Sequence, residues 1–324
     1  MKRKPLFPGI ASALGMLVLI LDGKTALLGA QQGVQLCLMT VIPSLFPFFF
    51  LSNLLTSSLA GVPSRMLRPL GQLFPVPPGA ESLVLAGLLG GYPTGAQAVA
   101  RGYQAGQLSR AQAQSLLTFC SQPGPAFLFG MVGFLFPRRW MVWLLWGIIL
   151  LSALVTAQFF GVNPKSCPIP ATKMPDSTPS SLAGALRATA TVCGWVVIFR
   201  VLLAFLSRWF LWILPEEGQV LLTGLLELTN GCLLLEVLPN VRLRFVLAAG
   251  LLAMGGVCVA MQTVTLLGEL SPRTYFLGKL LQSIIAVSLA VAFAWGVWLP
   301  MVVIFLIFAL IRQKRSSFPG AVGV

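Results

Sequence analysis

Histidine is absent from this chain of 324 residues. It is the commonest general base, the commonest zinc ligand and the usual partner of a nucleophilic serine or cysteine. A hydrolase built on Ser121 or Cys120 would therefore lack its usual base, and we expect no lysine from the apolar segments to lie near them. The sequence predicts a protein that is not an enzyme and has no catalytic residues.

Charged residues are also scarce. They make up 9% of the chain, against roughly 25% in soluble globular domains. Hydrophobic residues make up 57%, and the mean hydropathy is +0.89. The apolar runs are long and continuous, which excludes the short alternating strands of a membrane β-barrel. These features predict an all-α polytopic protein of the plasma membrane, surrounded by lipid.

Cysteine gives no sign of a metal or disulfide framework. None of the six cysteines forms a C-x-x-C pair, and all but Cys167 lie in apolar surroundings. Buried cysteine commonly behaves as a small hydrophobic residue. We expect no metal and no cofactor, apart from a proton or sodium ion that could couple to transport.

Basic residues outnumber acidic ones by 22 to 8, which gives a net charge of +14. In a membrane protein the positive-inside rule accounts for such an excess, so nucleic acid is not an expected partner. The densest clusters, Met1–Lys4 and Arg312–Arg315, place both termini in the cytoplasm. The first apolar run, Ile10–Leu21, could belong to a secretory signal, but the polytopic chain favours an uncleaved first span.

The apolar runs predict about eight to ten membrane segments, at about 20 residues for each crossing. One polar stretch rich in Pro, Ser and Thr, residues 163–181, reads as an aqueous linker. It divides a single transmembrane domain, residues 1–324, into a first half (34–162) and a second half (182–268). Residues 269–324 supply C-terminal membrane segments that cross twice, with a turn near Trp298, and a basic tail.

Helix breakers interrupt the apolar runs in both halves. In the first half they lie in "GLLGGYPTG" (Gly87–Gly95) and "FCSQPGPAFLFG" (Phe119–Gly130). In the second half "GLLELTNG" (Gly224–Gly231) and "MGGVCVAMQTVTLLG" (Met254–Gly268) stand in corresponding places. Matching interruptions in two halves are typical of transporter repeats with interrupted or re-entrant helices.

A broken helix in lipid exposes peptide groups that only protein or a water-filled cavity can satisfy. Half-helix N-termini at such breaks suit an anionic ligand group. Kinked packing between helices is the alternative, because small residues also let helices approach closely. The polar residues at the breaks favour a substrate-binding site, for which the first half supplies Tyr92, Pro93, Thr94, Gly95, Ser121, Gln122 and Pro123.

The second half supplies Glu227, Thr229, Asn230 and Gln262. An acidic side chain between apolar runs is a functional hypothesis by default. The alternative for Glu227 is an interfacial position in a surface ion pair. Arg200, also inside an apolar run, could pair with Glu227, face an anionic ligand or extend to the interface.

The stretches "GGYPTGAQAV" and "LSRAQAQSLLTFCSQPGPAFLFGMVG" resemble the signature of the YlbJ-type sporulation integral membrane proteins. These belong to the nucleoside-recognition, or gate-domain, group related to concentrative nucleoside transporters. "VIPSLFPFFF", "ELTNG" and "GGVCVAMQ" fit in the same order, so the resemblance covers about Val34 to Gly268; Cys258 stands where the family suggests a serine. The resemblance implies two gate-like halves whose broken helices meet at the membrane centre.

The resemblance also implies a role in endospore formation, with movement of the dianion dipicolinate across the outer forespore membrane. We therefore expect a transporter or facilitator of a small anionic metabolite that works by alternating access. Glu227 would bind a coupling proton or sodium ion, or a polar edge of the ligand; the cation is favoured, because a carboxylate repels a dianion. The alternative is a non-transporting membrane scaffold required for sporulation. The sequence leaves the oligomeric state open.

Overall fold

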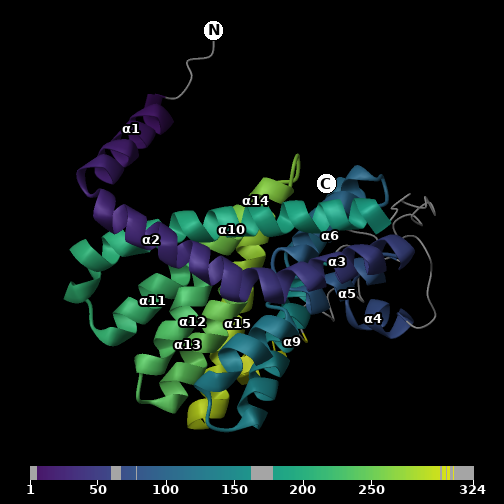
Figure 1. Ribbon diagram of the computed structural model, residues 1–324. Coiled ribbons are helices and arrows are strands. Elements are labelled where there is room, and N and C mark those ends of the chain that lie inside the picture. The colour runs from purple at the N-terminus through teal and green to yellow at the C-terminus, as the bar shows by residue number, and fades with distance from the viewer. Residues whose placement is uncertain are drawn as a thin grey trace.

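The computed structural model describes residues 6–59, 67–77, 79–161, 178–299, 301–303, 305–306 and 309. Within these ranges the regular structure is entirely helical. α1 (Leu6–Leu21) projects from the remaining helices (Figure 1). Asp22 ends α1 and caps α2, because its carboxylate accepts a hydrogen bond from the Thr25 amide.

α2 (Gly23–Leu36), a π-helical turn (Cys37–Val41) and α3 (Ile42–Leu59) form one continuous helix. The first half predicted from the sequence began only at residue 34. The helix begins earlier because "GKTALLGAQQG" contains good helix formers and no proline. Its irregularity lies at the π-turn, just before Pro43.

The rest of the first half consists of short helices followed by a long one. After α4 (Arg68–Leu73), α5 (Glu81–Gly90) and α6 (Thr94–Gln104) are separated by one break, and α7 (Arg110–Leu117) and α8 (Pro125–Phe127) by a second. A π-turn (Leu128–Val132) and a 3₁₀ turn (Gly133–Leu135) follow α8. The half closes with α9 (Arg139–Phe160).

The second half begins with α10 (Thr178–Trp209), so residues 178–181 of the predicted linker are helical; residues 162–177 lie outside the described residues. After a 3₁₀ turn (Leu211–Ile213), α11 (Glu216–Leu226) and α12 (Leu228–Leu234) meet at a break. A further 3₁₀ turn (Leu235–Val237) leads to α13 (Val241–Met254), which is broken from α14 (Gly256–Leu266). The long helix α15 (Pro272–Trp295) follows.

Residues 23–160 and 178–295 therefore contain a similar order of elements once the short helix α4 is set aside: a long helix, two helix–break–helix units and a closing long helix. The second unit extends beyond the predicted boundary at residue 268, because α15 closes it. The leading helices, α2–α3 and α10, lie side by side (Figure 1). They are antiparallel, because Gly29 approaches Val201, Gly33 approaches Val197, and Asn53 donates a hydrogen bond to the Ser181 carbonyl. An antiparallel pair of equivalent helices is what an inverted-topology repeat produces.

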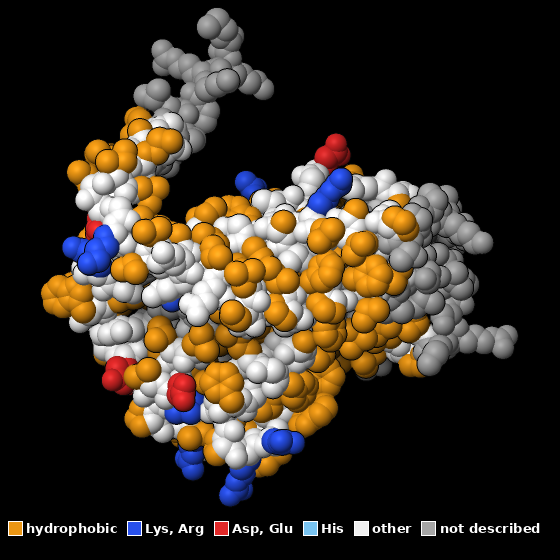
Figure 2. Space-filling view, viewed as in Figure 1, with side chains coloured by type: hydrophobic (Ala, Val, Ile, Leu, Met, Phe, Trp, Pro, Cys, Tyr) orange, Lys and Arg blue, Asp and Glu red, His pale blue; other side chains and the backbone are white. Residues whose placement is uncertain are grey.

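Among the described residues, five helical segments are long and apolar enough to cross a membrane: Gly23–Leu54, Arg139–Phe160, Pro179–Trp209, Val241–Leu266 and Pro272–Trp295. On the face in Figure 2, hydrophobic side chains cover the middle, and most visible basic side chains lie near the edges. This distribution suits a belt of lipid around the molecule. The chain is thus an all-α polytopic membrane protein.

The C-terminal apolar run turns where the sequence predicted. Gly296, in the left-handed conformation, ends α15, and residues 299, 301–303, 305–306 and 309 are helical again. The basic clusters on which the cytoplasmic placement of the termini depends, residues 1–4 and 312–315, lie outside the described residues. That placement stays a prediction.

Candidate functional site

The two breaks of the first half contact each other through glycine. Gly91 has a φ of +80°, and a Cβ added there would lie 2.7 Å from the Gly124 nitrogen. A Cβ added at Gly87 or Gly95 would overlap the carbonyl oxygen of Cys120. Since only glycine permits such a close approach of backbones, the Gly-rich sequence brings the loop 120–124 against the break between α5 and α6.

The breaks of the second half meet in the same manner. Gly231 of α12 packs on the backbone of Gly224 in α11. Gly256, with a φ of +74°, begins α14, and a Cβ there would lie 2.9 Å from the Gly224 carbonyl oxygen. The break at Glu227 and the break at Gly255 are therefore neighbours.

Tyr92 joins the two pairs of breaks. Its hydroxyl donates a 2.6 Å hydrogen bond to the carbonyl oxygen of Leu252, near the end of α13. A Cβ added at Gly255 would lie 3.3 Å from the Tyr92 ring. The first break of one half thus contacts the second break of the other half, and all four interruptions meet in one region.

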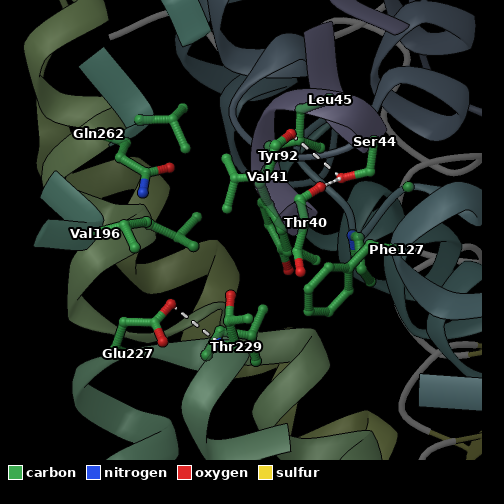
Figure 3. Close-up of a pocket in the computed structure, with 15 residues that line it drawn as sticks. Thr40, Val41, Ser44, Leu45, Tyr92, Phe127, Val196, Glu227, Thr229 and Gln262 are labelled. Atoms are coloured by element: carbon green, nitrogen blue, oxygen red, sulfur yellow. Dashed lines mark hydrogen bonds between the residues drawn. The ribbon is translucent and has the colours of Figure 1, made fainter. Parts of the chain in front are cut away.

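A pocket lies at this meeting point (Figure 3). Its empty space is about 570 Å³, a figure that includes the open solvent at its mouth. Five of the predicted site residues line it. The lining consists of Thr40, Val41, Ser44, Leu45, Tyr92, Pro123, Gly124, Phe127, Val192, Val196, Glu227, Leu228, Thr229, Val259 and Gln262.

Glu227 is the acidic residue of the pocket wall and is 2% exposed. Its backbone is extended (φ −139°, ψ 111°), which ends α11 and starts α12. The carboxylate caps α12 by accepting hydrogen bonds from the amides of Thr229 (3.0 Å) and Asn230 (2.7 Å) and from Asn230 Nδ2 (2.5 Å). Within the described residues Glu227 forms no surface ion pair, because its side chain is buried; its depth in the membrane stays a prediction.

Arg200 reaches Glu227 through Asn230. Its Nη1 donates to Asn230 Oδ1 (2.5 Å), while Asn230 Nδ2 donates to the Glu227 carboxylate. Its Nη2 donates to Gln32 Oε1 on α2 (2.7 Å). Arg200 thus connects the leading helix of the first half with the capped break of the second half.

Gln262 lies on α14 and points its amide toward the pocket beside Val196 (Figure 3). Its Nε2 donates to the Cys258 sulfur at 3.3 Å, one turn earlier. A thiol accepts a hydrogen bond only weakly. Cys258 therefore leaves much of the hydrogen-bonding capacity of Gln262 for a ligand or water.

Six predicted site residues do not line the pocket. Thr94 bonds back to the Gly90 carbonyl, and Gly95 packs on Cys120. Asn230 lies one hydrogen bond behind the wall. The other three are Pro93, which precedes α6 at a cis peptide bond, and the pair Ser121 and Gln122, both fully buried.

One wall of the pocket, formed by the π-turn and the start of α3, was not predicted from the sequence. Thr40, Val41, Ser44 and Leu45 line the pocket from the first long helix. Ser44 Oγ donates to the Thr40 carbonyl at 2.6 Å, which satisfies a peptide group where the helix is irregular. Such π-turns are frequent at functional sites. In the sequence, the hydroxyl residues Thr40 and Ser44 beside Pro43 were the available sign of this irregular, polar turn.

The sequence reasoning also missed Lys279. This α15 residue is 1% exposed, and its ammonium donates to the Ser121 carbonyl, to Gln282 Oε1 (3.0 Å) and to the Tyr92 hydroxyl (3.4 Å). The expectation that no lysine lies near Ser121 was therefore wrong. Lys279 contacts the backbone carbonyl of Ser121. In the sequence, a lysine and a glutamine three residues apart inside an apolar run were the signal of this buried polar group.

No protein-family model and no solved structure matches the chain. The chain is similar to the "Sporulation integral membrane protein YlbJ" of Bacillus subtilis (strain 168), at 26% identity over 84% of this chain and 77% of the relative. The comparison confirms the YlbJ part of the resemblance, while the nucleoside-recognition part stays a prediction. With its several apolar helices, the chain is a multi-pass integral membrane protein that is similar to YlbJ.

Proposed function

We propose that the chain is a transporter or facilitator of a small anionic metabolite, which binds in the pocket between the two sets of broken helices. The observation that carries this proposal is the meeting of all four breaks around one pocket, joined by the hydrogen bond from Tyr92 to Leu252. Broken helices at the contact of two repeats are the usual construction of substrate sites in secondary transporters. Packing alone gives no reason for Glu227, Thr229 and Gln262 to face an open space.

Charge around the pocket favours an anion. Glu227 contributes one negative charge to the wall. Two cations lie just behind it: Arg200, linked through Asn230, and Lys279, in contact with Tyr92. Their formal sum is +1, and charges act strongly where water is excluded. An anion would therefore find a net attractive field even though Glu227 lies beside it.

Alternating access needs two bodies that can move relative to each other. The matching element order supplies two such bodies, and the pocket lies where they meet. In the proposed cycle the halves rock about the bound ligand, and Glu227 binds a coupling proton or sodium ion. A cation there would also offset the repulsion between Glu227 and an anionic ligand.

The name of the relative suggests the biological setting. Bacillus subtilis YlbJ is called a sporulation integral membrane protein. By analogy, this chain would act in endospore formation, in the outer forespore membrane, with dipicolinate as the first ligand to test. Dipicolinate carries two carboxylates on a flat ring, which fits the proposed preference for an anion.

Uptake by proteoliposomes tests the proposal. Purified protein is reconstituted, and entry of radiolabelled dipicolinate is measured against protein-free liposomes, with lactate and benzoate as competing anions. The proposal expects saturable uptake that unlabelled dipicolinate suppresses more strongly than the other two anions do. If uptake matches that of protein-free liposomes while the protein is folded, a non-transporting scaffold becomes the better account.

A further inference from the structure

A buried cation with no carboxylate partner lies beside the second break of the first half. Within the described residues, no ion pair involves Lys279, although its side chain is 1% exposed. An unpaired charge at membrane depth is costly and points to a function. Its surroundings show what that function is.

All three contacts of the Lys279 nitrogen are to oxygen atoms that accept hydrogen bonds. The Ser121 carbonyl can only accept, and the Tyr92 hydroxyl uses its proton on Leu252. Gln282 presents Oε1, because its Nε2 donates to Gln122. Three acceptors require three N–H donors, which an ammonium has and a neutral amine lacks. The geometry therefore fits a positive charge.

The break leaves one of these oxygens in need of a donor. In a continuous helix the Ser121 carbonyl would accept from the amide of residue 125, but that residue is proline and has no N–H. The Lys279 ammonium supplies the missing donor. The ring of Tyr92, 4.9 Å away, presents its face to the same charge.

One further oxygen lies at this place without a partner. Ser121 Oγ is completely buried and forms no hydrogen bond. Backbone carbonyl, amide carbonyl and hydroxyl oxygens together form the kind of ligand set that binds sodium at the broken helices of transporters. The ammonium contacts three oxygens of this set, the Ser121 carbonyl, Gln282 Oε1 and the Tyr92 hydroxyl, while Ser121 Oγ stays without a partner.

We propose that Lys279 is a tethered cation: its ammonium fills a monovalent-cation site made by Ser121, Tyr92 and Gln282, and thereby holds the break at residues 120–124 against α15. The protein then needs no free ion at this position. Removal of the side chain leaves an oxygen-lined cavity that takes up a small free cation. The inference holds whether or not the neighbouring pocket transports a solute.

Thermal unfolding in different salts tests the proposal. The full-length protein and the variants Lys279→Ala and Lys279→Met are unfolded in sodium, methylammonium and choline chloride at equal ionic strength. Choline is too large for the cavity and serves as the reference ion. Lys279→Met fills the same space without charge, so it separates the loss of volume from the loss of the cation.

We expect the wild-type Tm to be the same in methylammonium chloride and in choline chloride. Both variants should unfold several degrees lower than wild type in choline, and methylammonium should raise Tm saturably for Lys279→Ala alone. Sodium bound at Glu227 would raise Tm of wild type and variants alike, so in sodium only the extra rise of Lys279→Ala over wild type reports the Lys279 site. Three results would overturn the proposal: no methylammonium-specific rise for Lys279→Ala, an equal methylammonium rise for wild type, or a wild-type Tm for Lys279→Met. If Lys279→Ala does not accumulate, Lys279→Gly is produced and purified in the presence of methylammonium. A Tm of Lys279→Gly that methylammonium does not raise would also contradict the proposal.

Discussion

The hydroxyl of Tyr92 donates a 2.6 Å hydrogen bond to the carbonyl oxygen of Leu252, 160 residues later in the chain. Tyr92 lies in the first break of one half, and Leu252 lies in the last turn before the second break of the other. This bond connects the two halves of the chain at the pocket. It is the structural reason to treat the four interruptions as one site.

Glu227→Gln should leave the fold in place and abolish coupled uptake. The glutamine keeps one accepting oxygen but turns an NH₂ group toward the donors of Thr229 or Asn230. An unsatisfied buried donor should lower the free energy of unfolding by about 1–3 kcal/mol. The substitution removes the charge that would bind the coupling ion, which should raise the barrier to transport by at least about 1.4 kcal/mol. Dipicolinate uptake should therefore fall at least about tenfold. Uptake across a pH series, with and without sodium, provides the measurement.

Glu236→Gln is the matched control, because Glu236 is exposed and lies in the same hairpin. It should keep wild-type uptake and stability. If the Glu227 variant shows the same rates and the same pH profile as this control, Glu227 has no part in coupling.

Gly95→Ala should destabilise the protein, because the new Cβ would overlap the carbonyl oxygen of Cys120. Relief requires a backbone shift at the contact between the two breaks, and overpacking of this kind costs typically 1–3 kcal/mol. Gly147→Ala in α9 is the control, since nothing lies within 4 Å of a Cβ at that position. Tm should fall for Gly95→Ala and stay level or rise for Gly147→Ala. Equal values would mean that the breaks do not pack as described.

Arg200→Met should cost more stability than Arg208→Met. Arg200 makes two charge-assisted hydrogen bonds to Asn230 and Gln32, and its loss leaves the Asn230 oxygen unpaired. Arg208 forms an ion pair with Asp22 at 3.2 Å, but its side chain is 59% exposed, and such pairs contribute about 0–1 kcal/mol. Tm of the two variants gives the comparison. A larger effect at Arg208 would contradict the assigned role of Arg200 as the link between α2 and Glu227.

The sequence predicted the breaks well, because glycine and proline act locally. Four interruptions were read from the positions of breakers, and each lies between helices in the structure. Glu227 was found for a similar reason: an acid between apolar runs stands out without knowledge of the fold. The distinction between Tyr92, which lines the pocket, and Gly95, which packs on Cys120, needed the structure. Both residues have the same sequence context.

Other parts of the site depend on contacts between distant segments. Lys279 lies in the first third of α15, where a basic residue would be assigned to the membrane interface. It is buried because α15 packs against residues 118–122. The π-turn that brings Thr40 into the wall has no marker except a following proline. Linear patterns do not reveal such partners, because their consequences appear only when the helices pack.

Filling the pocket tests the central claim most directly. Val196 lines the pocket from α10 and is 2% exposed, whereas Ile198 on the same helix is 58% exposed. Dipicolinate uptake by proteoliposomes is compared for Val196→Phe, Ile198→Phe and wild type at matched amounts of folded protein. The account predicts that Val196→Phe loses saturable uptake while Ile198→Phe keeps the wild-type rate. Wild-type uptake by a stably folded Val196→Phe would contradict the claim that the ligand passes through this pocket.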